Sequence, residues 1–331
     1  MKALALFSGG LDSVLAMKLI VDQGIEVTAI NVNTGFGSTN DRRDHMQNMC
    51  DQIGAKLEIL DLRQEFLDEV LFDPKYGYGK NFNPCIDCHG FMFRYTGKLL
   101  EKYNASFMIS GEVVGQRPMS QRKEAMVQVA SLSDQEDDLI LRPLCAKLLP
   151  ETKPEREGWV DRSKLMDITG RSRERQLALA KEIGLEDFES PGGGCLLTDI
   201  QFSNRLEEFV KNDAMKINDI DTLKAGRHLR LPNGAKLIVG RHREDNDKLE
   251  ATNSDKYTQL RITDTTGPYA LLESNASKED KQLAAKIVIT YGKTSIDQTY
   301  SVKINGEDFK DIKFETKEIL FRHENNILSI K

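Results

Sequence analysis

Short runs of β-forming residues alternate with helical patterns over the first 185 residues of this 331-residue chain. Strands are predicted at 3–7, 26–33, 56–60, 106–110 and 139–141, and helices at 12–23 and 41–53. Because parallel strands need crossover connections, this alternation predicts a parallel sheet with helices on both faces. Residues 1–185 are therefore expected to form a Rossmann-like α/β domain.

The chain changes character after a glycine-rich segment, Pro191-Gly192-Gly193-Gly194-Cys195, which no regular helix or strand accommodates. We assign 186–204 as a loop and linker that carries Cys195. Beyond it, strands are predicted at 237–239, 260–262, 286–290, 299–304 and 319–322, and the Asn-Gly pairs at 233–234 and 305–306 are typical of hairpin turns. Residues 205–331 are expected to form a smaller, strand-rich α+β domain.

Composition narrows the class of protein. Hydrophobic residues make up 39% and charged residues 30%, as in ordinary globular proteins. No run of about 18 apolar residues is present, so no membrane span is expected, and the apolar N-terminus is interpreted as a strand and not as a signal peptide. We expect a cytoplasmic location, where the five cysteines are more suited to metal binding or catalysis than to disulfides. The net charge of −6 does not exclude a nucleic-acid partner, which needs only a local basic face.

The loop Ser8-Gly9-Gly10-Leu11-Asp12-Ser13 lies between the first expected strand and helix. Its glycines allow a close backbone approach to a ligand, and the amides that open the following helix attract anions. Asp12 would repel a phosphate unless Mg²⁺ lies between the two groups. The loop is neither a Walker loop nor a dinucleotide loop. The alternative is a strand–turn–helix corner with no ligand.

This loop resembles the SGGxDS signature of PP-loop ATP pyrophosphatases. The resemblance implies a Rossmann-like PP-loop domain that cleaves ATP between its α and β phosphates, giving an adenylated acceptor and pyrophosphate. The ATP-binding residues expected from it, together with two from the motif described next, are Ser8, Gly9, Gly10, Asp12, Ser13, Asn31, Gly111 and Gln116.

Three further motifs narrow the PP-loop class. The segment 109–116 with Ser120-Gln121, and Leu141-Arg142-Pro143-Leu144 with Lys147, resemble motifs of 4-thiouridine synthetases, while Asn83-Pro84-Cys85 is similar to the cysteine region of 2-thiouridylases. Taken singly, these residues also suit strand ends, surface positions or a structural ion pair. The tRNA-binding extension ahead of the loop and the rhodanese segment of 4-thiouridine synthetases are not apparent, so tRNA docking and sulfur delivery are expected to differ.

Cys85-Ile86-Asp87-Cys88-His89 and the distant Cys195 admit four interpretations. A c-type haem conflicts with a cytoplasmic location, and a zinc site would need the adjacent residues Cys88 and His89 on one ion. A redox dithiol that forms a persulfide stays open. We favour a [4Fe-4S] cluster on Cys85, Cys88 and Cys195, which leaves one iron open and resembles the arrangement of some archaeal 4-thiouridine synthetases. Cys50 and Cys145 are expected to be small hydrophobes.

The second domain contains Arg227-His228-Leu229-Arg230 and, after the strand at 237–239, Gly240-Arg241-His242-Arg243. This pattern resembles the NFACT-R RNA-binding module, and it makes Arg227, Arg230, Arg241 and Arg243 candidates for phosphate contacts. A solvated basic hairpin is the alternative. Upstream, Arg171, Arg173 and Arg175 form either a basic rim for tRNA or an ordinary helix start.

Together these features predict ATP- and Mg²⁺-dependent tRNA uridine thiolation of the 4-thiouridine synthetase kind, with Asp12, Cys85, Cys88 and Cys195 in catalytic roles. The expected partners are tRNA and a sulfur donor, either sulfide or a cysteine desulfurase, and no membrane. The oligomeric state is left open. Alternatives are a 2-thiouridylase-like enzyme, another PP-loop enzyme such as an amide-forming ligase, and a non-enzymatic RNA-binding quality-control factor.

Overall fold

The computed structural model describes residues 1–37, 42–134, 138–188, 194–318, 320 and 327–330. The chain divides into two compact units, Met1–Thr198 and Asp199–Lys331, each with its own hydrophobic core. The division falls inside the segment 186–204 and leaves Cys195 in the first unit. The strand predicted at 319–322, apart from Leu320, and residues 189–193 of the glycine-rich segment lie outside the described residues.

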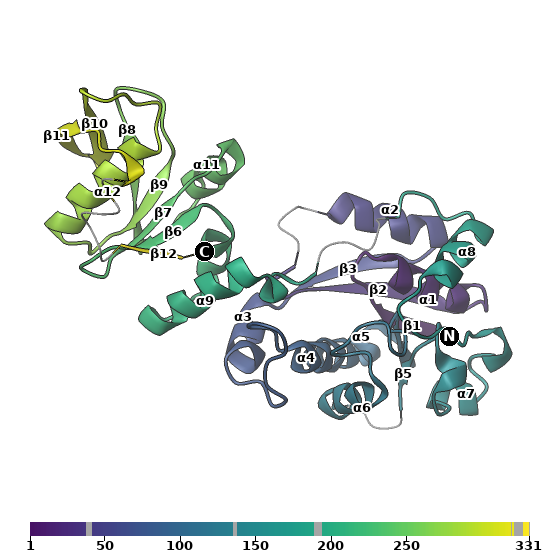
Figure 1. Ribbon diagram of the computed structural model, residues 1–331. Helices are drawn as coiled ribbons and strands as arrows, with labels where there is room; N and C mark the ends of the chain where they lie inside the picture. The colour runs from purple at the N-terminus through teal and green to yellow at the C-terminus, as the bar shows by residue number, and fades with distance from the viewer. Residues whose placement is uncertain (38–41, 135–137, 189–193, 319, 321–326, 331) are drawn as a thin grey trace. The chain divides into compact units, whose positions relative to one another are not determined.

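The first unit is built on a parallel sheet of order β3-β2-β1-β4-β5, which confirms the predicted α/β class (Figure 1). Its strand order reverses between β1 and β4. Parallel sheets bind ligands at the carboxyl ends of the strands where the order reverses, so the segments after β1 and β4 are the expected ligand site. The strands are β1 (Lys2–Leu6), β2 (Glu26–Asn33), β3 (Lys56–Asp61), β4 (Phe107–Ser110) and β5 (Ile140–Leu141).

Helices cover both faces of this sheet (Figure 1). One face packs against α1 (Leu11–Val21), α2 (Arg43–Ile53) and α8 (Glu174–Glu182), and the other against α4 (Cys85–Gly97) and α6 (Lys123–Leu132). Helix α1 is apolar on most sides because α2, α8 and the sheet all cover it. The shorter helices are α3 (Arg63–Phe66), η1 (Leu67–Leu71), α5 (Leu100–Tyr103), η2 (Ala146–Leu148), α7 (Lys153–Arg156), η3 (Arg162–Lys164) and η4 (Leu196–Thr198).

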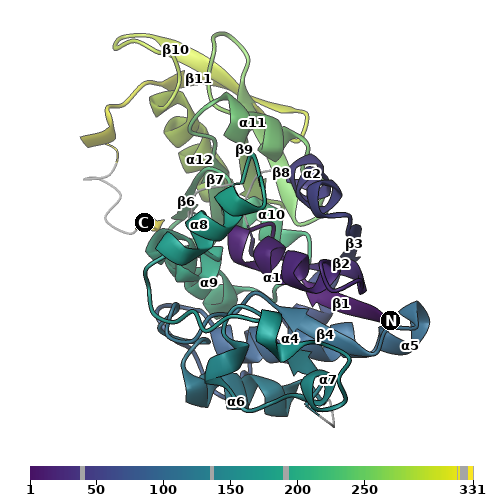
Figure 2. The same cartoon turned by 90° about the vertical axis from the view of Figure 1, so that its right-hand side faces the viewer.

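The second unit is built on an antiparallel sheet of order β11-β10-β8-β9-β7-β6-β12 (Figure 2). Side chains alternate between its faces, as strands require: Leu237 and Val239 pack in the core with α12 (Lys278–Thr290), whereas Ile238 packs with Leu249 of α11. The strands are β6 (Arg227–Arg230), β7 (Lys236–Val239), β8 (Tyr257–Ile262), β9 (Ala270–Glu273), β10 (Thr299–Ile304), β11 (Glu307–Lys313) and β12 (Leu328–Ile330). The other helices are α9 (Ile200–Asn212), α10 (Asp219–Lys224) and α11 (Arg243–Glu250).

Two local predictions for the second unit have opposite outcomes. The hairpin turn between β10 and β11 is confirmed, since Asn305 (φ 48°) and Gly306 (φ 83°) both adopt the left-handed backbone of such turns. The strand predicted at 286–290 is wrong, because these residues are the last turns of α12. Ile287, Val288 and Ile289 are fully buried in a helix that Ser277 caps upstream, so tertiary packing overrides their strand preference. Among the helices of the described residues, none is long and apolar enough to cross a bilayer.

Gly111, directly after β4, lies against the first turn of α1. A Cβ at this position would be 2.5 Å from the backbone nitrogen of Ser13 and 2.6 Å from its Cα. These contacts are shorter than van der Waals separation, so only glycine lets the end of β4 approach the start of α1 this closely. The two segments that follow β1 and β4 are thereby held in direct contact.

Replacing Gly111 with alanine should lower the free energy of unfolding by about 1–3 kcal/mol, because the new methyl group must displace backbone atoms of α1. Denaturant unfolding of the purified variant measures this change. Gly37→Ala is the matched control, since no atom lies within 4 Å of a Cβ there and its backbone is not left-handed. Equal stability of the two variants would contradict the close approach.

Candidate functional site

The phosphate loop, Ser8–Ser13, joins β1 to α1 and is shaped by its own backbone. Gly9 has a φ of +79°, which favours glycine, and the hydroxyl of Ser13 donates a hydrogen bond of 2.7 Å to the carbonyl of Gly10. The side-chain amide of Asn31, at the carboxyl end of β2, donates a 2.8 Å hydrogen bond to the carbonyl of Phe7. Asn31, proposed as an ATP-binding residue, therefore holds the strand end from which the loop begins.

Asp12 lies in the first turn of α1, and one of its carboxylate oxygens has no partner among the residues that the structure describes. Its Oδ2 accepts a 2.6 Å hydrogen bond from Gln116 and lies 3.5 Å from the guanidinium of Arg173. Its Oδ1 is buried and accepts no hydrogen bond from the described residues. A buried, unpartnered carboxylate oxygen is suited to a hard cation, so these residues fit Mg²⁺.

Glu112 is a buried carboxylate that joins three elements of the first unit. His89 of α4 contacts one of its oxygens at 2.9 Å through Nδ1, and Arg142, directly after β5, donates to the other at 2.9 Å through Nε. Burial favours a raised pKa for Glu112, but Arg142 and His89 outweigh it and lower this pKa to about 2. The arginine of the Arg-Pro-Leu motif is therefore the ion-pair partner of Glu112.

His89 connects Glu112 to Cys85. Burial opposes protonation of the imidazole, but hydrogen bonds to Cys85 and Glu112 and their charges raise the pKa of His89 to about 10. The sequence suggests His89 only as a zinc or haem ligand and gives Glu112 no role of its own. A histidine near Cys85 and a glutamate next to Gly111 are a weak indication of this pair, because the sequence does not show that the two side chains meet.

The structure brings Cys195 to Cys85 and Cys88. Cys85 is the first residue of α4 and Cys88 lies almost one turn later, while the Cys85 thiol raises the pKa of both Cys88 and Cys195, and the Cys195 thiol raises that of Cys88. The segment after Cys195 is anchored by a 2.9 Å hydrogen bond from the amide of Leu196 to the carbonyl of Phe36. Two regions that are remote in sequence thus contribute to one thiol cluster.

The three thiols differ in their affinity for protons. Burial favours a raised pKa for Cys85, but the hydrogen bond and charge of His89, with Ser120 and Arg117, bring this pKa below that of an ordinary thiol. Burial raises the pKa of Cys88 strongly and that of Cys195 to about 11. Cys85 is therefore the thiol of this cluster that most readily becomes a nucleophilic thiolate.

The thiol cluster has the type of ligand that an iron–sulfur group uses, but its side chains do not stand in a ligating arrangement. It supplies three thiol sulfurs from two separate segments, and a hydrogen bond to one of them is compatible with cluster ligation. Within the described residues, no three His, Cys, Asp or Glu side chains are arranged to hold a metal ion. Cys50 and Cys145 are fully buried, and burial raises their pKa values to about 12 and about 11.

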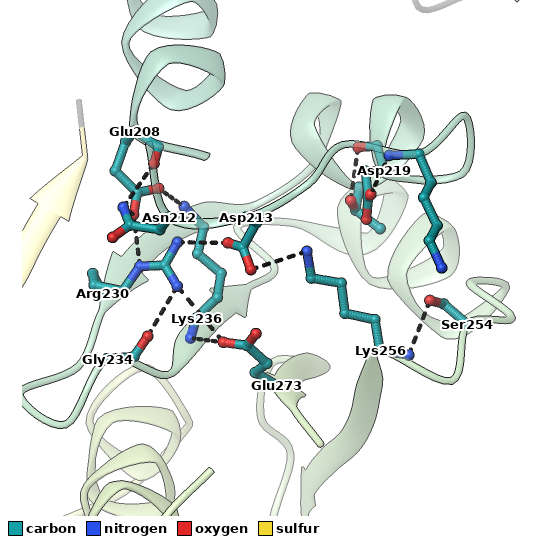
Figure 3. A network of polar contacts seen from close by, with 12 residues as sticks. Glu208, Asn212, Asp213, Asp219, Arg230, Gly234, Lys236, Ser254, Lys256 and Glu273 are labelled. Carbon is teal, nitrogen blue, oxygen red and sulfur yellow. Dashed lines mark hydrogen bonds and ion pairs between the residues drawn. The ribbon is translucent and has the colours of Figure 1, made fainter. Parts of the chain in front are cut away.

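In the second unit, Arg230 belongs to a network of ion pairs (Figure 3). Its guanidinium lies 2.6 Å from Glu208 and 3.0 Å from Asp213, and its side chain is only 11% exposed. Lys236, whose side chain is fully buried, also pairs with Glu208, although burial lowers its pKa to about 8. The network ties α9 to the hairpin formed by β6 and β7, so Arg230 holds the unit together and has little surface for a ligand.

The other three arginines proposed to bind RNA lie in different settings. Arg227 stacks on the ring of Tyr291 at 4.7 Å, and Arg241 donates to both carboxylate oxygens of Asp245. Arg243 is 95% exposed and lies 3.9 Å from Asp247. Of the four, Arg243 is the most available to a phosphate.

Each of the two units contains a segment that matches a known protein family. Residues 1–141 match the family described as tRNA methyl transferase HUP domain, and residues 226–320 match the NFACT protein RNA binding domain. The first unit is therefore similar to the HUP domain of that family, and the second to the NFACT RNA binding domain. We call these the PP-loop unit and the NFACT-type unit below.

Each of the similar proteins matches one part of this chain and not its whole length. A tRNA-specific 2-thiouridylase of Fusobacterium nucleatum is 31% identical over 107 residues, covering 31% of this chain and 31% of that protein. A probable tRNA sulfurtransferase of Thermococcus kodakarensis is 29% identical over 134 residues, covering 40% and 35%. A solved structure of a 4-thiouridine synthetase with RNA and ATP aligns at 22% identity with a TM-score of 0.40, covering 55% and 40%. The chain spans about a third of the length of the first curated relatives.

In the reduced, metal-free protein, iodoacetamide should modify Cys85 before Cys88 and Cys195. Because the pKa of Cys85 is lowered, its reactive thiolate persists to lower pH than that of an ordinary thiol. Glu112→Gln removes the charge that favours protonated His89, so the pH midpoint of Cys85 alkylation should rise. Peptide mass spectrometry over a pH series measures each midpoint.

The matched control for this experiment is Glu69→Gln. Glu69 of η1 pairs with Arg94, which lies on α4 as His89 does, whereas the carboxylate that pairs with His89 is Glu112. The Cys85 midpoint of this control should equal that of the unmodified protein. Equal alkylation rates of the three thiols would show that His89 does not distinguish Cys85.

Arg230→Ala should lower the stability of the NFACT-type unit by about 3 kcal/mol, because it leaves largely buried carboxylates without their partner. Arg243→Ala should change stability by less than about 0.5 kcal/mol, as expected for an exposed side chain. Hydrogen exchange of β6 and β7 in the full chain reports the stability of this unit. Equal exchange rates in the two variants would mean that the network contributes nothing to the fold.

Proposed function

We propose that the protein catalyses ATP-dependent thiolation of a uridine in tRNA. One observation carries the proposal: the segment that follows β4 contacts both the phosphate loop and the helix that bears the cysteines. Gly111 lies against Ser13, Gln116 binds Asp12, and Glu112 binds His89, which in turn bonds to Cys85. A base activated at the loop would therefore lie close to a sulfur held at the thiol cluster.

The first step is adenylation of the base. The phosphate loop and the N-terminus of α1 bind the phosphates of ATP, and Asp12 would hold Mg²⁺, which neutralises phosphate charge. The uracil oxygen attacks the α-phosphate, pyrophosphate leaves, and AMP becomes the leaving group on the base. Positioning and charge neutralisation account for most of the catalysis in such a transfer.

The second step replaces AMP by sulfur from the thiol cluster. Cys85, Cys88 and Cys195 would hold either a [4Fe-4S] group, which takes up sulfide, or a persulfide, whose outer sulfur is transferred from the persulfide of a cysteine desulfurase. A cluster would supply an iron with an open coordination position for sulfide. In either case His89 orients Cys85, and Glu112 and Arg142 hold His89.

The NFACT-type unit is proposed to bind the tRNA, with Arg243 as its most exposed candidate contact. The motifs at 109–116 and 141–144 favour 4-thiouridine as the product. The identity to 2-thiouridylases over the first part of the chain makes 2-thiouridine the second candidate. Both reactions belong in the cytoplasm, where tRNA is modified.

The purified protein, supplied with ATP, Mg²⁺, tRNA and sulfide under anaerobic conditions, should release pyrophosphate and yield a thiolated nucleoside. Mass spectrometry of digested tRNA identifies the nucleoside, and chromatographic retention distinguishes 4-thiouridine from 2-thiouridine. Asp12→Ala should lower pyrophosphate release roughly 10²-fold or more, since it removes a charge placed at the phosphates. Cys195→Ser should still bind ATP and tRNA but yield no thiolated nucleoside.

Cys50→Ala is the control, because Cys50 is buried in the hydrophobic core of the PP-loop unit and should keep full thiolation. Full thiolation by Cys195→Ser would overturn the sulfur-transfer role and favour an amide-forming ligase. Tight tRNA binding without any pyrophosphate release would favour a non-enzymatic RNA-binding protein.

A further inference from the structure

Two side chains at the start of α8 bear on Asp12: Gln176 acts through Gln116, and Arg173, which directly precedes the helix, pairs with Asp12 itself. Gln176 is fully buried, and its Nε2 donates a 2.8 Å hydrogen bond to Oε1 of Gln116. Gln116 then donates 2.6 Å to Oδ2 of Asp12. Arg173 lies three residues before Gln176, and its guanidinium is 3.5 Å from the same oxygen, Oδ2 of Asp12.

The hydrogen bonds from Gln176 to Gln116 and from Gln116 to Asp12 form a relay that fixes the orientation of the Asp12 carboxylate. Gln176 donates to the side-chain oxygen of Gln116, and the nitrogen of Gln116 donates to Asp12, so one direction of hydrogen bonding runs from Gln176 to Asp12. Oδ2 is thereby occupied, while Oδ1 stays buried and has no donor within the described part of the chain. The carboxylate is held with one oxygen reserved for a ligand.

Arg173 differs from its neighbour Arg175. The Arg173 side chain is 18% exposed and faces only a loose ion pair, whereas Arg175 is 52% exposed and lies 2.6 Å from Asp167. A guanidinium beside a carboxylate that binds Mg²⁺ would compete with the cation for it. The same guanidinium is well suited to phosphate oxygens, which it binds through paired, charge-assisted hydrogen bonds.

We propose that α8 completes the ATP site: Arg173 binds the nucleotide phosphates, and Gln176 acts through Gln116 to position Asp12. Without nucleotide, Arg173 pairs with Oδ2 of Asp12; with Mg²⁺ and ATP, the cation would bind Oδ1 and the guanidinium would turn to the phosphate oxygens. Arg173 is thus a binding residue, and Gln116 and Gln176 are positioning residues. The inference rests on the proposed use of ATP at the phosphate loop.

Calorimetric titration of the full chain with Mg²⁺ and the non-cleavable analogue α,β-methylene-ATP tests Arg173. Arg173→Ala should weaken binding roughly tenfold or more, because a charge-assisted hydrogen bond is lost, and Arg173→Lys should recover part of it. Arg175→Ala, two residues along the chain, should bind as tightly as the unmodified protein. Unchanged or tighter binding by Arg173→Ala would show that Arg173 only neutralises Asp12 and would overturn the proposal.

Gln176→Met and Gln116→Met test the relay, since both keep the side-chain length without a hydrogen-bond donor. The Mg²⁺ concentration for half-maximal pyrophosphate release should rise several-fold in each, whereas the KM for ATP should change less than kcat. Unaltered Mg²⁺ dependence in a folded Gln116→Met protein would overturn the positioning role. If the unmodified protein does not bind the analogue, the proposed function fails; if it binds and Arg173→Ala binds equally, only this inference fails.

Discussion

The buried carboxylate of Glu112 is the interaction on which the candidate site depends. It receives Arg142 from the segment after β5 and His89 from α4, and it lies one residue after the glycine that contacts α1. Buried ion pairs add little net stability, because desolvation offsets their attraction, but loss of one partner is strongly destabilising. The pair therefore matters mainly for orientation: it holds a charged imidazole against Cys85.

Sheet topology explains why these groups meet. The strand order reverses between β1 and β4, so the chain segments that leave their carboxyl ends lie next to each other. The segment after β1 is the phosphate loop, and the segment after β4 carries Gly111, Glu112 and Gln116. The proposed nucleotide site and the thiol cluster lie together because both are built at this edge of one sheet.

A basic sequence suggests side chains that face solvent and bind phosphate, but two basic side chains of the NFACT-type unit bind an internal carboxylate instead. Arg230 and Lys236 pair with Glu208 and so attach α9 to the β6–β7 hairpin, while Arg243 remains exposed. An arginine that binds phosphate and an arginine that binds an internal carboxylate look the same in a sequence. Only the position of the partner carboxylates distinguishes them.

Local patterns sufficed for the parallel sheet, the phosphate loop and the hairpin at Asn305-Gly306, because strand alternation, glycine conformation and helix starts depend on neighbouring residues. They failed for 286–290, where burial in α12 overrides β-branched preference. The sequence also singled out Cys85, Cys88 and Cys195 by residue type. What it did not contain is the side-chain partnership of His89 with Glu112 and Arg142, or of Gln176 with Gln116 and Asp12. These contacts join segments that are 23 to 104 residues apart, and only the packing of strands and helices sets which side chains meet.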